Sequence, residues 1–195
     1  MEAVKEVEGK ALPLGWDDVD TDQIVPSDAL KRIERTGFGQ FLFSAWREDP
    51  DFVLNKPEHA GAVVLLAGQN FGSGSSREHA PWAIQDYGFG AVIASSFADI
   101  FKNNCAKIGL LAVELSADAV DELLQTVRED PEAVISVDLE GCVVKAPGFE
   151  EPFAFDNFAR YRLLNGLDDI ALTLTHQEEL QAFEKARPSY LPSVL

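Results

Sequence analysis

Cysteine is scarce in this chain, and the scarcity limits the chemistry that the chain can hold. Only Cys105 and Cys142 occur in 195 residues, 37 positions apart and without metal-ligand spacing. Two thiols are too few for the usual four-cysteine iron–sulfur site, and only three histidines stand beside them. The sequence therefore predicts two reduced core cysteines, with no disulfide framework and no metal site of the chain's own.

Basic charge and long apolar runs are also in short supply. The chain has 33 acidic and 16 basic residues and a formal net charge of −17, which argues against nucleic acid or an anionic membrane surface as a partner. No apolar run approaches the ~20 residues of a membrane span, and the start MEAVKEVEGK does not resemble a signal peptide. We therefore expect a cytoplasmic protein with a single domain over residues 1–195.

What the chain does have is a glycine- and serine-rich loop, GQNFGSGSSREHAPW, at residues 68–82. The apolar run 62–67 before it is bounded by glycines and predicts a buried strand, and the pattern after it predicts a helix. Gly72 and Gly74 allow backbone conformations that other residues avoid, and they let a ligand approach the main chain. The order strand, glycine-rich loop, helix is typical of a binding loop.

The start of the following helix favours a small anion as the ligand of this loop. Ser75 and Glu78 have the spacing of a capping box, so the helix should begin here with its free N–H groups facing the loop. Arg77 adds a planar fork suited to a carboxylate or a phosphate. The same spacing also fits a helix cap with no further role, and the residues alone leave both interpretations open.

Common alternatives fail on spacing. The dinucleotide pattern G-x-G-x-x-G fails because Arg77 stands where the third glycine belongs, and no Gly-Lys-Ser/Thr phosphate loop occurs. The hydrolase elbow G-x-S-x-G would need a serine at Gly74. A calcium loop opening at Asp18 fails because Gln23 stands where glycine is required. The aspartates of 17–26 are therefore interpreted as a turn whose side chains accept from nearby N–H groups.

The middle of the chain alternates apolar runs with helical patterns, which predicts a parallel α/β core. After the loop we expect a helix, a strand, a helix, a strand and a helix, at 79–87, 91–94, 97–104, 110–115 and 116–129. Beyond these we expect a β-hairpin, an edge strand, a helix, an apolar link and a last helix, at 134–144, 153–155, 156–164, 167–174 and 176–186.

A short basic stretch stands out in so acidic a chain. Leu30 is followed within five positions by three cations, Lys31, Arg32 and Arg35. A solvated surface would explain these charges. The functional interpretation is a mobile flap over 27–39, hinged at Gly37 and Gly39, that carries positive charge and one apolar side chain to a substrate.

Four segments together resemble a known family. They are DTDQIVP at 20–26, NFGSGSSREHAPWAI at 70–84, SFADIFKNNCAKIGLL at 96–111 and LLNGLDDIALTLTH at 163–176. On these residues the chain resembles the small subunits of bacterial 3-isopropylmalate dehydratase, and the likeness spans most of its length.

The resemblance implies a fold and a partner. The fold is the aconitase-type swivelling β/β/α domain, with a parallel central sheet region, an additional β-hairpin and C-terminal helices. In that family a separate large subunit carries a [4Fe–4S] cluster, and this chain would bind no cofactor. The reaction implied is a hydro-lyase isomerisation of 2-isopropylmalate to 3-isopropylmalate through 2-isopropylmaleate, in leucine biosynthesis.

The resemblance also implies roles for particular residues. Ser75 would be the base, acting as an alkoxide, and Ser76 and Arg77 would hold the carboxylates of a dicarboxylate substrate. The basic stretch would discriminate between substrates, with Leu30 at the isopropyl group and a carboxylate met by Lys31, Arg32 or Arg35. Glu78 is expected to cap the helix, and His79 to serve as a structural hydrogen-bonding residue.

Two alternatives stay open. The same chemistry could act on homocitrate or on a methylmalate such as citramalate, which would leave the motifs intact and change only the flap. A rival of another class is a dicarboxylate-binding regulatory module without chemistry of its own. A longer acidic substrate would require more positive charge and less apolar surface in the stretch 30–35.

Overall fold

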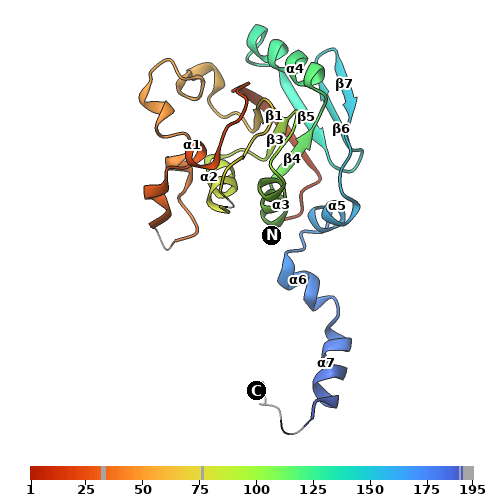
Figure 1. Ribbon diagram of the computed structural model, residues 1–195. Helices are drawn as coiled ribbons and strands as arrows, with labels where there is room; N and C mark the ends of the chain where they lie inside the picture. The colour runs from red at the N-terminus through yellow and green to blue at the C-terminus, as the bar shows by residue number, and fades with distance from the viewer. Residues whose placement is uncertain (32–33, 76, 189, 191–195) are drawn as a thin grey trace.

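A seven-stranded sheet forms the centre of the molecule, with strands in the order β4-β3-β2-β1-β5-β6-β7 (Figure 1). The computed structural model describes residues 1–31, 34–75, 77–188 and 190. The strands are β1 (Glu6–Pro13), β2 (Val64–Leu66), β3 (Ala91–Ala94), β4 (Leu111–Glu114), β5 (Val134–Asp138), β6 (Val143–Ala146) and β7 (Phe149–Pro152).

The sheet is mixed, and β1 is the strand at which its direction changes. β1 pairs in parallel with β2, and β2 with β3 and β3 with β4 are parallel too. On its other edge β1 pairs antiparallel with β5, which opens the antiparallel run β5-β6-β7. The predicted parallel α/β core is therefore confirmed, and the predicted hairpin joins it into one continuous sheet.

Seven α-helices lie among the described residues, and they account for most of the expected helical patterns. Their bounds are α1 (Thr21–Ile24), α2 (His79–Tyr87), α3 (Asp99–Ile108), α4 (Ala117–Glu129), α5 (Asn157–Leu164), α6 (Asp169–Leu174) and α7 (Gln177–Ala186). Between β1 and β2 the chain also forms five short 3₁₀ helices, η1 (Ser27–Lys31), η2 (Gly39–Phe41), η3 (Trp46–Glu48), η4 (Val53–Asn55) and η5 (Pro57–His59).

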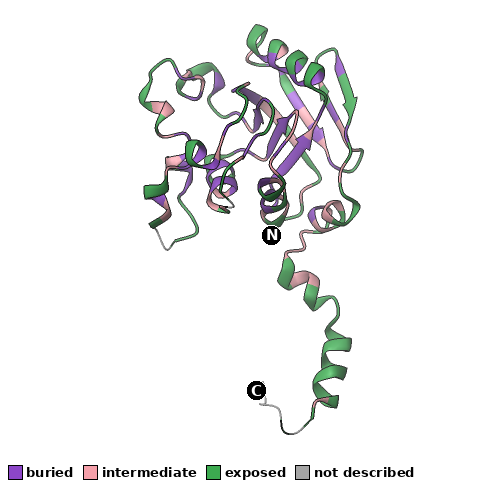
Figure 2. Ribbon diagram, viewed as in Figure 1, coloured by how far each residue is buried: buried purple, intermediate pink, exposed green. Residues whose placement is uncertain are grey.

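Each face of the sheet is covered by its own apolar core. Because side chains alternate along a strand, Leu65 of β2 enters one core and its neighbours Val64 and Leu66 enter the other. α2, α3 and the segment between β1 and β2 fill the first core. The second contains the buried face of α4, which the period of the sequence predicts, and Leu163 of α5 (Figure 2).

The structure corrects two predictions near the C-terminus. The edge strand lies at Phe149–Pro152 and not at 153–155, because Gly148, with φ +74°, supports a tight turn directly after β6. The apolar link at 167–174 contains a helix, α6, since the Asp168 carboxylate accepts from the Ala171 N–H at 2.8 Å and caps it. α3 also begins and ends later than the predicted 97–104.

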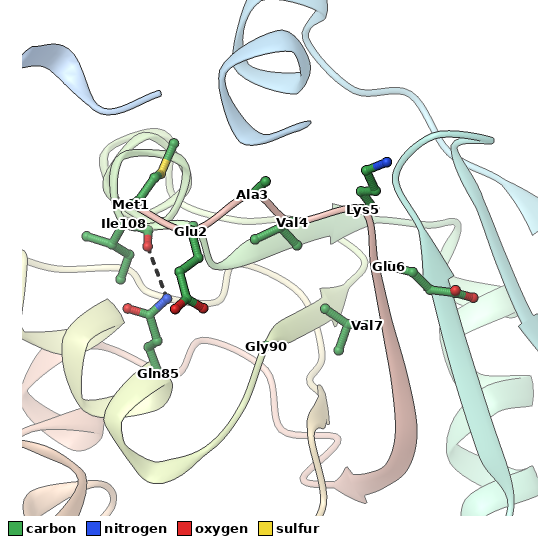
Figure 3. A pocket seen from close by; sticks show the side chains of 11 residues that line it. Met1, Glu2, Ala3, Val4, Lys5, Glu6, Val7, Gln85, Gly90 and Ile108 are labelled. Carbon is green, nitrogen blue, oxygen red and sulfur yellow. Dashed lines mark hydrogen bonds between the residues drawn. The ribbon is translucent and has the colours of Figure 1, made fainter. Parts of the chain in front are cut away.

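A cavity of about 590 Å³ opens beside the N-terminal segment (Figure 3). It is lined by residues 1–7 and by Gln85, Gly90, Ile108 and Gly109. Gly90 and Gly109 precede β3 and β4, so this cavity lies at the amino ends of the parallel strands. The glycine-rich loop follows the carboxyl end of β2, and it therefore lies at the opposite edge of the sheet.

Candidate active site

Loops that follow β1, β2 and β3 meet at one edge of the sheet, because the carboxyl ends of parallel strands share an edge. The Gly72 N–H donates to the Val19 carbonyl at 2.7 Å, and the Thr21 N–H donates to the Ser73 carbonyl at 2.9 Å. The Phe71 N–H donates to the Ser96 carbonyl at 3.1 Å. The glycine-rich loop is thus held from both sides along its backbone.

Two glycines of the loop are required by space, and Gly72 is required by conformation as well. Gly72 has φ +77°, and a Cβ built there would lie 2.2 Å from the Phe101 ring. At Gly68 a Cβ would lie 2.0 Å from the Asp17 carboxylate, which accepts from the Gln69 N–H at 2.8 Å. Gly74 has φ +91°, and a Cβ there would make only ordinary contacts, 3.5 Å from Asp20 and from Thr21, so glycine is required here by conformation.

Ser75 is exposed at the tip of this loop. Its carbonyl accepts from the Thr21 hydroxyl at 3.2 Å and from the Arg77 N–H at 2.8 Å. The predicted capping box is wrong: the N-cap of α2 is Glu78, without a side-chain cap bond, and the helix begins at His79. The tight turn from Ser75 to Arg77 places Ser75 outside the helix, so its hydroxyl is not used as a cap.

Arg77 reaches back to the segment after β1. Its guanidinium pairs with the Asp22 carboxylate, and the two side chains are 25% and 54% exposed. The sequence predicts only a turn at Asp22, and its ion pair with Arg77 was not predicted. The cap of α1 comes from Asp20, whose carboxylate accepts from the Gln23 N–H at 2.8 Å while the Gln23 side chain accepts from the Asp20 N–H. The sequence held one sign of this pair: DTDQIVP, which contains Asp22, and SSRE, which contains Arg77, are both motifs of the family that the chain resembles.

The flap has one end anchored on α2. Phe38 is fully buried, and its N–H donates to the Asp86 carboxylate at 2.9 Å. A Cβ at Gly39 would lie 2.8 Å from the backbone of Asp86, so Gly39 is required for close packing and is not placed as a free hinge. Gly37, with φ +82°, stands in open space.

The predicted substrate residues of the flap are only partly brought to the loop. Leu30 is half-buried, and the Lys31 ammonium pairs with Asp28 at 2.8 Å. The Arg35 guanidinium stacks over the Trp82 ring at 5.1 Å, which links the flap to α2. Arg32 and Ser76 lie outside the described residues.

His79 has an aromatic environment and not the hydrogen-bonded one that was predicted. Its ring lies 5.2 Å from that of Phe38 and 4.7 Å from that of Trp82. Its Nδ1 is buried and has no hydrogen-bond partner among the described residues. Burial lowers the pKa of His79 below its ordinary 6.5, because the interior disfavours the imidazolium.

The cysteines do not form a ligand set for an iron–sulfur cluster. Cys105 is fully buried, and burial raises the pKa of its thiol well above the usual range. Cys142 is half-buried, and its thiol donates to the Leu139 carbonyl at 3.5 Å. Within the described ranges no three His, Cys, Asp or Glu side chains are grouped to hold a metal ion.

The fold and the loop define a class of protein. Residues 1–118 match the family model of the aconitase C-terminal domain, so the chain belongs to the family of aconitase C-terminal domains. The matched span contains the parallel strands and the whole glycine-rich loop. Among the described helices none is long and apolar enough to cross a membrane.

Relatives over the full length narrow the family to the small subunits of 3-isopropylmalate dehydratase, of which this chain is a member. It is 72% identical over 195 residues to the 3-isopropylmalate dehydratase small subunit of Rubrobacter xylanophilus, covering 100% of both chains. It is 52% identical to the small subunit of Streptomyces coelicolor, covering 100% of this chain and 99% of that one. A solved structure of 3-isopropylmalate dehydratase from Methanocaldococcus jannaschii matches with a TM-score of 0.67 at 27% identity, covering 91% of this chain and 98% of that one.

Proposed function

We propose that this chain is the small subunit of a 3-isopropylmalate dehydratase, which isomerises 2-isopropylmalate to 3-isopropylmalate through 2-isopropylmaleate together with a large subunit. The observation that carries the proposal is the Ser75–Arg77 loop, fixed at the carboxyl edge of the sheet in a full-length member of this family. The small-subunit designation of the relatives implies the larger partner.

The residues of the loop suit the proton transfer that such an isomerisation needs. Abstracting a proton beside a carboxylate develops negative charge, which nearby donors must stabilise. Ser75 is proposed as the base, with its alkoxide stabilised by Arg77 and by the free N–H groups at the start of α2. Ser75 is exposed and does not cap α2, which supports this role for its hydroxyl.

Substrate carboxylates are proposed to bind Arg77 and Ser76. The Arg77 guanidinium can donate two parallel hydrogen bonds to the oxygens of a carboxylate, and Asp22 already holds the guanidinium at the loop. In the flap, Leu30 is proposed to meet the isopropyl group, while Lys31, Arg32 or Arg35 meets a carboxylate. The anchoring of Phe38 on α2 supports a loop over 27–39 whose exposed part moves while its end stays fixed.

The residues of this chain do not fit an iron–sulfur cluster, because Cys105 is buried as a thiol and Cys142 stands alone. We therefore place the family's [4Fe–4S] cluster on the large subunit and assign to this chain only binding and proton transfer. A cytoplasmic location fits a biosynthetic enzyme of this kind.

Reconstitution tests the proposal directly. The chain is mixed with its large subunit under anaerobic conditions and assayed in parallel against 2-isopropylmalate, homocitrate and citramalate. We expect activity on 2-isopropylmalate only with both chains present. Preference for homocitrate or citramalate would assign the chain to a related hydro-lyase. Tight dicarboxylate binding by the isolated chain, without activity in any mixture, would favour the regulatory module.

Replacing Ser75 tests the assignment of the base. Ser75→Ala should lower kcat by about 100-fold or more while substrate still saturates the enzyme, since only proton transfer is lost. Ser73→Ala is the matched control, because Ser73 contributes its backbone carbonyl to Thr21 and that bond survives the change. If Ser75→Ala and Ser73→Ala had the same kcat, Ser75 would not be the base.

A further inference from the structure

The C-terminal arm, residues 169–186, extends away from the body of the molecule (Figure 1). It comprises α6 and α7, and each residue from Thr173 to Ala186 is exposed, as Figure 2 shows. Four large apolar side chains of the arm face solvent, with exposed fractions of 74% for Ile170, 58% for Leu174, 38% for Leu180 and 68% for Phe183. The body of the chain therefore leaves these side chains uncovered.

The apolar residues of α7 lie on one side of the helix. Leu180 and Phe183 are three positions apart and share a face, whereas helical spacing places Gln181 and Lys185 on the opposite face. A helix of ten residues is too short to be stable in water on propensity alone, and such helices gain most of their stability from packing an apolar face. The arm thus has the pattern of a helix that packs against another surface.

The root of the arm, residues 162–171, is held by contacts with the body, whereas residues 173–186 are all exposed. The Asp168 carboxylate caps α6 through the Ala171 N–H and lies 3.4 Å from the ammonium group of Met1. Arg162 donates to the Leu167 carbonyl at 3.2 Å and pairs with Asp169. These contacts set the direction in which the arm leaves the body, so it is presented in a preorganised way.

The root also adjoins the flap of the candidate active site. A cavity of about 290 Å³ is lined both by Met1 and Asp168 and by Arg35, Thr36 and Trp82. A partner that covers the arm and continues over this cavity therefore reaches the flap, which is the part of the chain proposed to recognise substrate.

We propose that the C-terminal arm is a docking element for the large subunit, with Ile170, Leu174, Leu180 and Phe183 seated in an apolar groove of that subunit. This inference rests on the proposed function, because the partner is the one that completes the active site beside the flap. Helical spacing places Glu179 and Glu184 at the borders of the α7 stripe, so the groove should have a basic rim. A second copy of this chain would bring the same acidic borders and another net charge of −17 to the contact, and like charges oppose that pairing.

Binding of the intact chain to the large subunit tests the proposal. Phe183→Ser and Ile170→Ser should each raise the Kd measured by isothermal titration at least about tenfold, because buried aromatic and aliphatic anchors dominate interfaces. Gln181→Ser is the matched control, since it places the same residue in the same helix on the opposite face, and its Kd should stay within about twofold of wild type. At saturating large subunit all variants should reach wild-type kcat.

Three results would overturn the inference. The first is a wild-type Kd for both Phe183→Ser and Ile170→Ser. The second is a wild-type chain that sediments as a dimer and a Phe183→Ser chain that is monomeric with unchanged partner affinity, which would make a second copy the occupant. The third is weakening by Gln181→Ser equal to that by Phe183→Ser. Failure of the proposed function is a separate observation, namely tight binding of the wild-type pair without isomerase activity.

Discussion

At the scale of single residues, the candidate site rests on a charge pair and on glycine positions that admit no side chain. Arg77 is drawn to Asp22, which is 55 positions away in the chain, and Gly72 lies against the ring of Phe101. Both contacts hold the loop that carries Ser75. Each can be tested with a matched control elsewhere in the molecule.

Arg77→Lys should raise KM for the dicarboxylate at least about tenfold, because a lysine cannot replace a bidentate fork. The effect on kcat should be smaller. Arg47→Lys is the control, since Arg47 stacks over Tyr87 at 5.6 Å, at the far end of α2. Steady-state kinetics with saturating large subunit gives both constants, and an unchanged KM would rule out the bidentate role.

Gly72→Ala should lower the free energy of unfolding by about 2–4 kcal/mol, because it adds steric overlap with Phe101 to the strain of a positive φ. Gly148→Ala shares the positive φ, at +74°, but meets nothing within 4 Å, and should cost only about 1 kcal/mol. Urea denaturation of both variants measures the difference. If both variants lost the same free energy of unfolding, the overlap with Phe101 would contribute nothing to the loss.

At the scale of elements, α1 holds the glycine-rich loop in place. Asp20 and Gln23 cap this four-residue helix, and the buried Thr21 then donates twice to the loop, from its N–H and from its hydroxyl. A helix so short has little stability of its own. Its conformation and that of the loop therefore depend on each other.

Thr21→Val should lower kcat by about tenfold with a smaller change in KM, because it removes the hydroxyl bond to the Ser75 carbonyl and so loosens the position of Ser75, the proposed base. Thr126→Val is the control, since Thr126 loses a similar bond to the Glu122 carbonyl on α4, away from the site. Both variants should lose about 1 kcal/mol of stability. Steady-state kinetics of both variants checks the prediction, and equal kcat values for Thr21→Val and Thr126→Val would contradict it.

The sequence predicts correctly those helices and strands whose ends are marked by residues close to them in the chain. α5 begins and ends as predicted, within a residue, because Asp156 caps its start and Asn165 marks its end, and α2 ends as predicted before Gly88. The hairpin of β5 and β6 is confirmed, but the edge strand predicted at 153–155 lies at Phe149–Pro152, because Pro147 and Gly148 form a tight turn directly after β6. The sequence predicts an apolar link where α6 lies, because a helix of six residues is too short to show a clear helical period.

At the scale of the whole molecule, the buried His59 and the half-buried His79 make stability depend on pH. Burial lowers the pKa of His59 and of His79 below the ordinary 6.5. As the pH falls, these histidines are protonated in the unfolded chain before they are protonated in the folded one. Their contribution to the free energy of unfolding is therefore complete above about pH 6.5 and is lost as the pH drops through the pKa values of the folded protein. The carboxylates of Asp51 and Asp168, whose pKa values lie below 3.8, contribute in a separate and more acidic range.

Urea denaturation from about pH 7.5 to about pH 5 should therefore show a falling free energy of unfolding, and a double variant with His59→Gln and His79→Gln should show a flatter dependence. The comparison uses the slope and not the absolute stability, because the substitutions also change packing. An identical slope in both proteins would contradict the contribution of these two side chains.

The sequence by itself determined the parallel α/β core, the ends of most helices, the glycine-rich loop that carries Ser75 and Arg77, and the family. These features depend on residues close together in the chain, whose periods, caps and motif spacing are local. Only the tertiary structure decided that Asp22 pairs with Arg77, that Ser75 does not cap α2, and that the C-terminal arm stands uncovered. The pair of Asp22 and Arg77 and the bonds of Thr21 that hold the backbone around Ser75 join residues far apart in the chain, and only the packing of the sheet and its two cores brings such residues together.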